Sequence, residues 1–415
     1  MINIKDLRED FVNIKIALAK RGYEINQKTF EKLDKDRKTI QVDVENLQAE
    51  RNNLSNDFGK LKSSGEDTSQ LKETIDKINS ELDEKSLKLS SVLSDINKFL
   101  LDIPNIPHDS VPIGKDEKDN VVVETFGNIY SKNKKDHLEI TNMIDIETAV
   151  KIAGSRFSVL KGDLAKLQRA LIAFMIDEAI KNGYEEYYLP FLANKDSLVG
   201  TGQLPKFEED LFQASENLYL IPTAEVPLTN IYRDEVIDEK ILPLKLTSHT
   251  PCFRSEAGSY GKDTKGLIRQ HQFEKIELVQ ITNPDESMEC LNSLLKNACQ
   301  ILDLLELPYQ VIELCAGDLG FSSSKTFDIE VWMPSQNKYR EISSCSNFGD
   351  FQARRSNIKI NTVNGKCYAH TINGSALAVG RTLIALIENR YDGCDKIILP
   401  ESLKPYMGKL EIKLS

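Results

Sequence analysis

The chain lacks any run of about 20 apolar residues that could span a bilayer, and residues 1–10 lack the apolar core of a signal peptide. We therefore expect a cytoplasmic protein with no membrane contact. The seven cysteines are odd in number, scattered, and include no Cys-x-x-Cys pair. This pattern argues against a disulfide framework and against structural zinc, so we expect no zinc and reduced, mostly buried thiols.

Two common nucleotide-binding signatures are also missing. The sequence contains no Gly-x-x-x-x-Gly-Lys-Ser/Thr, and no Gly-x-Gly-x-x-Gly follows a strand pattern. If ATP binds, another kind of site must hold it. The formal net charge of -11 argues against nucleic-acid binding over the whole surface, although it leaves room for a local site.

A long helical pattern is present between residues 27 and 103. Apolar residues recur every seventh position from Leu33 to Leu61, and a second seam from Leu71 to Ile103 alternates spacings of four and three, with Lys85 as its one polar interruption. A polar segment containing Gly65 separates the seams and is typical of a turn. The pattern predicts an antiparallel two-helix coiled-coil hairpin on the order of 50 Å long.

The purpose of this arm is open on composition alone. Residues 27–103 hold 13 Lys and Arg against 16 Asp and Glu, a net charge of -3. A dimerisation or spacer element therefore explains the heptads as well as an RNA contact does.

The remaining chain suggests one linker and one large domain. We expect an N-terminal domain over 1–103, a proline-rich linker and entry segment over 104–130, and a catalytic domain over 131–415. Within the last, Asp163 is the expected N-cap of a helix that stops at Asn182. Further helices are predicted over 284–305 and 379–389, and strands over 187–189, 218–221, 326–332 and 367–372. These do not repeat as βαβ units, so the fold class is α+β on a mainly antiparallel sheet.

The residues with the clearest chemistry lie in two segments, 251–256 and 269–277. If both are strands of one hairpin, Arg254 and Glu256 share a face because residues two apart point the same way. Phe273, Lys275 and Glu277 line up in the same manner. A guanidinium can bind phosphate and carboxylate, and an aromatic ring can stack on a purine, so the pattern suits activation of a carboxylic acid with ATP. An ion pair between Arg254 and Glu256 is the simpler alternative.

These segments resemble motif 2 of the class II aminoacyl-tRNA synthetases. The run 374–388, with Arg381, resembles motif 3, and residues 188–190 are compatible with motif 1 at a dimer interface. Over essentially its whole length the chain resembles the bacterial-type seryl-tRNA synthetase family. The strings that carry this resemblance are at 105–117, 200–207, 221–228, 253–258 and 266–273.

The resemblance implies a serine–tRNA ligase. Such an enzyme converts L-serine and ATP to seryl-adenylate and pyrophosphate, then transfers serine to tRNA(Ser), and to tRNA(Sec) where that exists. It also implies a homodimer, Mg²⁺ bound with ATP, and an arm that contacts tRNA. Two alternatives remain: a paralogue that loads a non-tRNA acceptor, and a coiled-coil scaffold with an inactive catalytic domain.

The resemblance also implies roles for individual residues. Arg254, Arg381 and Glu277 would be catalytic, and Glu341 would bind Mg²⁺, although the run from Glu341 can also be read as an ordinary strand end. The serine-binding set would be Thr223, Ala224, Glu225, Arg254, Glu277, Asn373 and Ser375. The ATP-binding set would be Arg254, Ser255, Glu256, Arg269, Phe273, Glu341, Ile342, Ser343, Ser344 and Arg381.

Overall fold

The computed structural model describes residues 1–129, 134–257 and 266–414. The chain divides into two compact units, one of Met1–Tyr23 with Pro104–Ser415 and one of Glu24–Ile103. The boundary expected from the sequence kept 1–103 together, whereas the structure groups residues 1–23 with the larger unit. The last residue of the expected linker, 130, lies outside the described residues.

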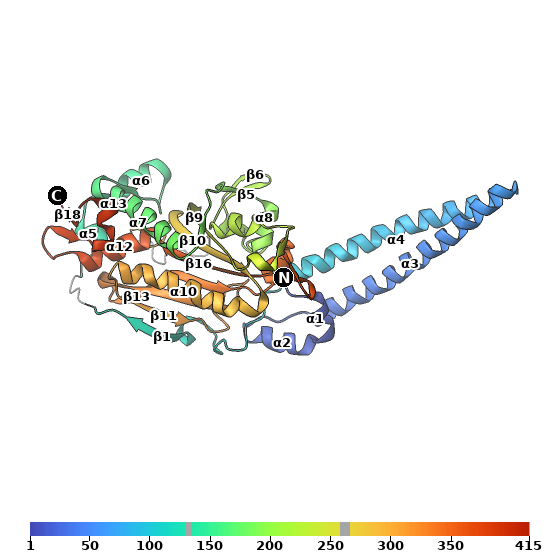
Figure 1. Cartoon of the computed structure of the whole chain (residues 1–415), viewed down its shortest axis with the longest axis horizontal. Coiled ribbons are helices and arrows are strands. Elements are labelled where there is room, and N and C mark those ends of the chain that lie inside the picture. Colours follow the sequence, from blue (N-terminus) through green and yellow to red (C-terminus); the bar gives the residue numbers. More distant parts are fainter. Residues whose placement is uncertain (130–133, 258–265, 415) are drawn as a thin grey trace. The chain divides into compact units, whose positions relative to one another are not determined.

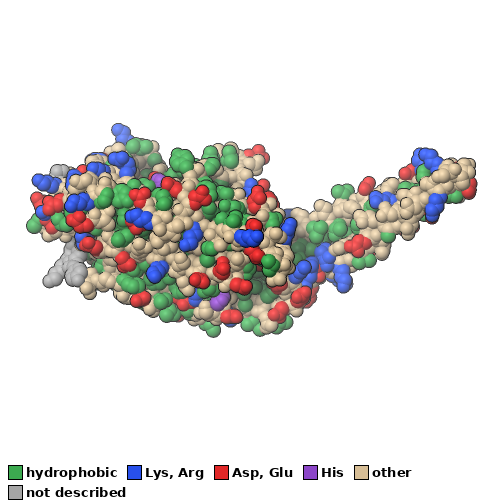
Figure 2. Space-filling view, viewed as in Figure 1, with side chains coloured by type: hydrophobic (Ala, Val, Ile, Leu, Met, Phe, Trp, Pro, Cys, Tyr) green, Lys and Arg blue, Asp and Glu red, His purple; other side chains and the backbone are tan. Residues whose placement is uncertain are grey.

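The smaller unit is the predicted helical hairpin, formed by α3 (Gln27–Ser64) and α4 (Ser69–Leu101) (Figure 1). The Asn26 side chain accepts a hydrogen bond from the Thr29 N–H and caps the start of α3. Gly65, with a φ of 80°, is the C-cap that follows the last helical residue, Ser64. The polar interruption at Lys85 is explained by a 2.6 Å contact between its Nζ and Asp43 Oδ2 on the facing helix. On the visible face, Lys and Arg are interspersed with Asp and Glu along the hairpin (Figure 2).

The larger unit is built on an eight-stranded sheet in the order β1-β11-β12-β13-β16-β10-β9-β4. Every neighbouring pair is antiparallel except β4 with β9, which confirms the expected mainly antiparallel α+β fold. The strands are β1 (Val121–Phe126), β4 (Glu185–Glu186), β9 (Leu244–Phe253), β10 (Gln272–Thr282), β11 (Tyr309–Glu313), β12 (Lys325–Met333), β13 (Lys338–Asn347) and β16 (His370–Ala378).

Shorter strands form four small sheets around this one. They are β2 (Ile144–Asp145) with β3 (Val159–Leu160); β5 (Leu192–Asn194), β7 (Leu218–Leu220) and β6 (Gln213–Ser215); β8 (Val236–Asp238), β14 (Lys359–Thr362) and β15 (Gly365–Tyr368); and β17 (Lys396–Ile398) with β18 (Glu411–Lys413). The helices of the larger unit are α1 (Ile4–Glu9), α2 (Phe11–Ala19), α5 (His137–Ile140), α6 (Ile146–Ala153), α7 (Gly162–Lys181), α8 (Lys195–Thr201), α9 (Glu225–Asn230), α10 (Ser287–Leu304), α11 (Phe351–Ser356), α12 (Val379–Arg390) and α13 (Lys404–Met407).

Side chains along β10 alternate between the main hydrophobic core on one face of the sheet and a cavity on the other face. Ile276 and Leu278 point into the main core, which they share with side chains of α7, α10 and α12. Phe273, Lys275 and Glu277 point to the opposite face and line a cavity. One set of positions on this strand therefore packs in the main core, and Phe273, Lys275 and Glu277 of the other set line the cavity.

Close packing explains one glycine of the motif 3 string. A Cβ at Gly374 of β16 would lie 2.5 Å from Leu294 Cδ2 on α10 and 2.8 Å from Cys345 Sγ on β13. A larger residue there would have to displace the buried side chains of Leu294 and Cys345.

Several local predictions need correction. The expected strand over 187–189 is not formed, since β4 ends at Glu186 and the Tyr188 side chain is 91% exposed. Asp163 is not the N-cap of α7 but lies in its first turn, where its carboxylate forms an ion pair with Lys409. The expected strand over 367–372 is divided between β15 and β16.

The cysteines follow the expected pattern. Those described are free thiols; five are buried, Cys367 is half-buried and Cys394 is exposed. Within the described ranges, no helix is long and apolar enough to cross a membrane.

Candidate active site

A cavity of about 560 Å³ opens on the face of the sheet opposite the helical core. This volume is within the usual range for small-molecule sites. It brings together all of the predicted serine- and ATP-binding residues except Ala224 and Ser255, as far as the described residues show: Thr223, Glu225, Arg254, Glu256, Arg269, Phe273, Glu277, Glu341, Ile342, Ser343, Ser344, Asn373, Ser375 and Arg381. Residues from five separate stretches of sequence thus converge on one site.

The two remaining residues have structural partners. Ala224 is fully buried just before α9. The Ser255 hydroxyl donates to the Glu209 carbonyl, and its N–H donates to the Asp210 carbonyl at 3.0 Å. Both residues fix the backbone beside the cavity.

The predicted strand geometry of Arg254 and Glu256 is wrong in detail. Strand β9 ends at Phe253, and Glu256 has a φ of 54°, so the two side chains do not share a strand face. Both nevertheless line the cavity, because the chain turns after the strand. Residues 258–265, which include the end of the motif 2 string, lie outside the described residues.

The partners of these two charged groups differ from the simple ion-pair alternative. Glu256 Oε2 lies 3.2 Å from Arg269 Nη1. Arg254 Nε donates to the Pro222 carbonyl at 3.3 Å, and its guanidinium lies 5.3 Å from the centroid of the Phe273 ring. Arg254 is thereby held at the cavity by the Pro222 carbonyl and the Phe273 ring.

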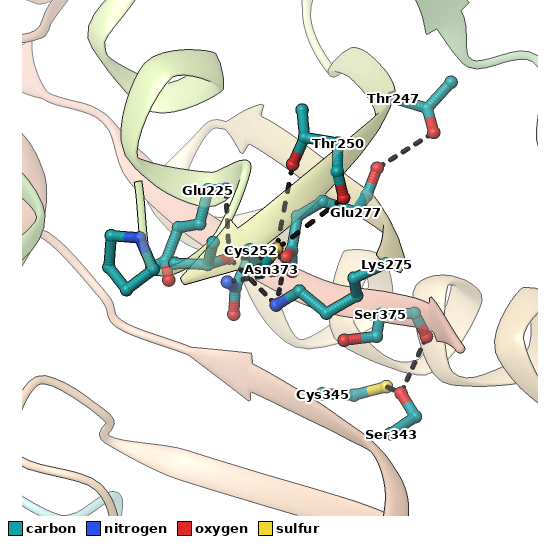
Figure 3. A network of polar contacts seen from close by, with 12 residues as sticks. Glu225, Thr247, Thr250, Cys252, Lys275, Glu277, Ser343, Cys345, Asn373 and Ser375 are labelled. Atoms are coloured by element: carbon teal, nitrogen blue, oxygen red, sulfur yellow. Dashed lines mark hydrogen bonds and ion pairs between the residues drawn. The ribbon is translucent and has the colours of Figure 1, made fainter. Parts of the chain in front are cut away.

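Glu277 is held by a buried network on β10 and β16 (Figure 3). The Thr223 hydroxyl donates to Glu277 Oε2 at 2.6 Å, and Asn373 Nδ2 donates to Oε1 at 3.3 Å. Lys275 contacts the same carboxylate and donates to the Thr223 hydroxyl at 2.8 Å. The negative charge of Glu277 is therefore compensated by Lys275.

Glu225 has a different environment at the start of α9. Its carboxylate accepts a hydrogen bond of 2.6 Å from the neutral amide of Gln352. Burial, and next the charge of Glu277, raise the pKa of Glu225 to about 7. The side chain that fixes Glu225 is thus a neutral amide, whereas Glu277 contacts Lys275, and this suits Glu225 to a cationic ligand group.

Arg381 links β13 to the segment before β10. Its Nη1 donates to the Glu341 carbonyl at 2.6 Å and lies 3.6 Å from the Glu341 carboxylate, while its Nε donates to the Ile268 carbonyl at 3.2 Å. The Arg381 side chain lines the cavity and is 27% exposed. It can therefore meet an anionic ligand without losing these backbone bonds.

The donor set beside Arg381 suits a hard cation bound together with a ligand. The Glu341 carboxylate is half-exposed at the cavity, and Ser344 on the same strand adds a hydroxyl. In the part of the chain that the structure describes, no group of three or more His, Cys, Asp or Glu side chains could hold a metal alone. One carboxylate with phosphate and water oxygens is the set that Mg²⁺ commonly takes.

The roles of two important residues were not predicted. Lys275 was expected on the same strand face as Phe273 and Glu277, but its contact with the Glu277 carboxylate was not. Gln352 could not have been predicted, since α11 carries no motif and reaches Glu225 only through the tertiary fold.

The arrangement of an antiparallel sheet, motif 2 and motif 3 around one cavity defines a class II aminoacyl-tRNA synthetase. Residues 206–390 match the family model described as "tRNA synthetase class II core domain (G, H, P, S and T)". Residues 1–107 match the model described as "Seryl-tRNA synthetase N-terminal domain". The chain belongs to the seryl-tRNA synthetase family.

Relatives and solved structures agree over the full length. The serine–tRNA ligase of Hydrogenovibrio crunogenus is 51% identical over 427 residues, covering 99% of this chain and 100% of the relative. That of Stutzerimonas stutzeri is 50% identical over 424 residues, with coverage of 99% and 100%. The seryl-tRNA synthetase of Pyrococcus horikoshii, in a crystal structure complexed with ATP, has a TM-score of 0.91 and 36% identity over 100% of both chains.

A further structure, the cytoplasmic serine–tRNA ligase of Naegleria fowleri in complex with AMP, has a TM-score of 0.87 and 28% identity, covering 100% of this chain and 99% of the other. These findings confirm the expected fold, family and enzyme class. They also favour the serine–tRNA ligase over the paralogue that loads a non-tRNA acceptor.

Proposed function

We propose that the chain activates L-serine with ATP to form seryl-adenylate and pyrophosphate, and then transfers serine to tRNA(Ser), and to tRNA(Sec) where that is present. The observation that carries the proposal is the pair of buried carboxylates beside Arg254. Glu277 contacts Lys275, whereas Glu225 accepts a hydrogen bond from the neutral amide of Gln352. A small zwitterion with an additional hydroxyl can satisfy both.

The serine end of the cavity would use these carboxylates for different groups. The α-ammonium would bind Glu225 and Thr223. The hydrogen-bond partner of the Glu225 carboxylate is a neutral amide, so the ammonium would supply a positive charge beside it. The serine hydroxyl would bind Glu277 and Ser375, with Asn373 nearby. A site built to hydrogen-bond a hydroxyl rejects alanine strongly, because alanine cannot make those hydrogen bonds.

The ATP end would be organised by two arginines and a ring. Arg254 would contact both the serine carboxylate and the α-phosphate, and Phe273 would stack on adenine. Arg381 would reach the outer phosphates, and Glu256 and Arg269 would lie near the adenine and phosphate groups. In-line attack of the serine carboxylate on the α-phosphorus then needs no enzyme nucleophile, so positioning and charge stabilisation account for the rate.

Glu341 and Ser344 would hold Mg²⁺ together with ATP. The ion would neutralise phosphate charge as pyrophosphate leaves. Arg381 would help to position Glu341 for this role, because it donates a hydrogen bond to the Glu341 carbonyl.

The arm of residues 27–103 would contact tRNA, and the enzyme would act as a cytoplasmic homodimer. The mixture of charges on the arm supports contact through a few placed basic residues and through RNA shape, rather than through a general positive field.

The test is serine-dependent exchange of pyrophosphate into ATP with a panel of amino acids. We expect exchange with serine, and at least a hundredfold less with alanine or threonine at equal concentration. Exchange with another amino acid in preference to serine would contradict the proposal. Exchange with serine but no charging of tRNA(Ser) would favour the paralogue.

A further inference from the structure

Gln352 is a fully hydrogen-bonded side chain beside the amino-acid end of the cavity. It lies on α11 and is 1% exposed. Its Nε2 donates to Glu225 Oε1 at 2.6 Å and to the Thr201 carbonyl at 3.2 Å, while its Oε1 accepts from the Thr371 hydroxyl at 2.7 Å. Because a backbone carbonyl can only accept, the amide NH₂ must face Thr201 and Glu225.

A neutral donor has a different effect on a carboxylate from a cation. Lys275 fixes Glu277 and also cancels its charge. Gln352 fixes one oxygen of Glu225 without cancelling the charge, so the carboxylate is oriented and still able to attract a cation. The two carboxylates of the pocket are thereby prepared for different partners.

Helix α11 also holds the wall of the cavity that Thr201 belongs to. Arg355 Nη1 donates to the Val199 carbonyl at 3.3 Å and to the Leu204 carbonyl at 3.2 Å. Thr201, which accepts from Gln352, lies between these two points and lines the cavity. One short helix therefore positions both the carboxylate and the backbone beside it.

We propose that Gln352 is a positioning residue of the amino-acid pocket, which holds Glu225 as the acceptor for the α-ammonium of the substrate and ties it to the Thr201 wall. The proposal rests on the proposed function, in which Glu225 binds serine. It goes beyond that function by making a residue outside the cavity lining responsible for affinity for the amino acid and not for ATP.

The first test compares Gln352→Leu with wild type in pyrophosphate exchange. Leucine is similar in size but cannot donate, so Glu225 loses its orienting bond. A hydrogen bond to a charged group is worth roughly a tenfold to hundredfold change in binding, and we expect the KM for serine to rise by about that factor. The KM for ATP should change less than about twofold, because Gln352 contacts the amino-acid end.

The second test uses Gln352→Glu and pH. The charged groups that act on Glu225 are Glu277, Lys275 and Arg254. At low pH the introduced carboxyl keeps a proton and can still donate to Glu225, whereas at high pH both groups ionise and repel each other. The KM ratio of variant to wild type should therefore grow by about tenfold from pH 6.5 to 8.5.

Gln280 offers a matched control. It is another fully buried glutamine of the same unit and lies on β10. It donates to the Tyr184 hydroxyl at 2.6 Å, and neither residue lines the cavity. Gln280→Leu should leave the KM for serine within about twofold of wild type. If Gln352→Leu does not fold, Thr371→Val removes the hydrogen bond that the Thr371 hydroxyl donates to Gln352 Oε1 and so loosens the amide that orients Glu225, with a smaller rise in the KM for serine.

The outcomes separate the two proposals. Wild-type enzyme that does not exchange with serine contradicts the proposed function. Wild-type enzyme that does so, with an unchanged KM for serine in Gln352→Leu, overturns the role of Gln352 alone. A pH-independent ratio for Gln352→Glu also overturns it, because a general packing defect would have no such dependence. A serine-dependent rise in Tm, present in wild type and reduced in Gln352→Leu, gives the same answer without catalysis.

Discussion

Glu225→Gln should make the protein more stable and less able to bind serine, with a pH dependence set by one group. The glutamate is 8% exposed, and burial with the charge of Glu277 raises its pKa from 4.5 to about 7. A carboxyl whose pKa is raised in the folded state contributes stability below its unfolded pKa. That contribution is lost as the pH rises through the folded pKa.

The magnitude follows from linkage. A shift from 4.5 to about 7 corresponds to roughly 3 kcal/mol when the group is fully ionised. Between pH 5.5 and 8.5 the cost of ionising Glu225 should grow by about 2 kcal/mol. Glutamine has nearly the same shape, can accept from Gln352 through its carbonyl oxygen, and carries no charge, so the variant avoids this cost.

The assay is urea unfolding of both proteins at several pH values in this range. The difference in unfolding free energy should favour Glu225→Gln increasingly as the pH rises, while serine-dependent exchange is lost throughout. Glu209→Gln, whose carboxylate lies outside the cavity lining, serves as the control and should give a constant difference. A stability difference between wild type and Glu225→Gln that does not change with pH would refute the reasoning.

The other predictions concern the ATP end, the ion pair and the arm. Arg254→Ala should lower the rate of pyrophosphate exchange by about a hundredfold or more at an unchanged Tm; near-normal exchange would contradict its role. Lys275→Met leaves Glu277 buried without its cation and should lower the free energy of unfolding in urea by roughly 3 kcal/mol. Adding Glu277→Gln should restore most of the lost stability, and no recovery would count against the Lys275–Glu277 ion pair. Replacing residues 30–103 with a short flexible linker should leave serine-dependent exchange intact while charging of tRNA(Ser) collapses; equal charging would mean that the arm is a spacer.

The sequence predicts the parts of this site that depend on local periodicity. The face shared by Phe273, Lys275 and Glu277 follows from strand alternation alone, and the structure agrees. The same rule fails for Arg254 and Glu256, because the strand ends at Phe253 and Glu256 takes a left-handed backbone conformation. No residue pattern in this sequence indicates that strand β9 ends at Phe253, at the first residue of the 253–258 string.

The heptad arm was equally accessible to sequence reasoning, since a seam of apolar residues is a local property. Even its one irregular position, Lys85, is explained by a single partner on the facing helix. The exact helix ends could not be predicted from the sequence, because caps such as Asn26 depend on one side-chain hydrogen bond.

The difference between the two buried carboxylates shows why residue roles are harder to predict than site membership. Glu225 and Glu277 are the same residue type and line the same cavity, so residue type alone does not separate their roles. Their chemistry diverges because one meets the lysine two positions before it on its own strand, and the other meets an amide from a helix over 120 residues away. Charge in a closed pocket depends on the partner more than on the residue, and that partner is decided by the fold. The family resemblance already implies that Glu225 binds the ammonium and Glu277 the hydroxyl, and the different partners of the two carboxylates support that proposal.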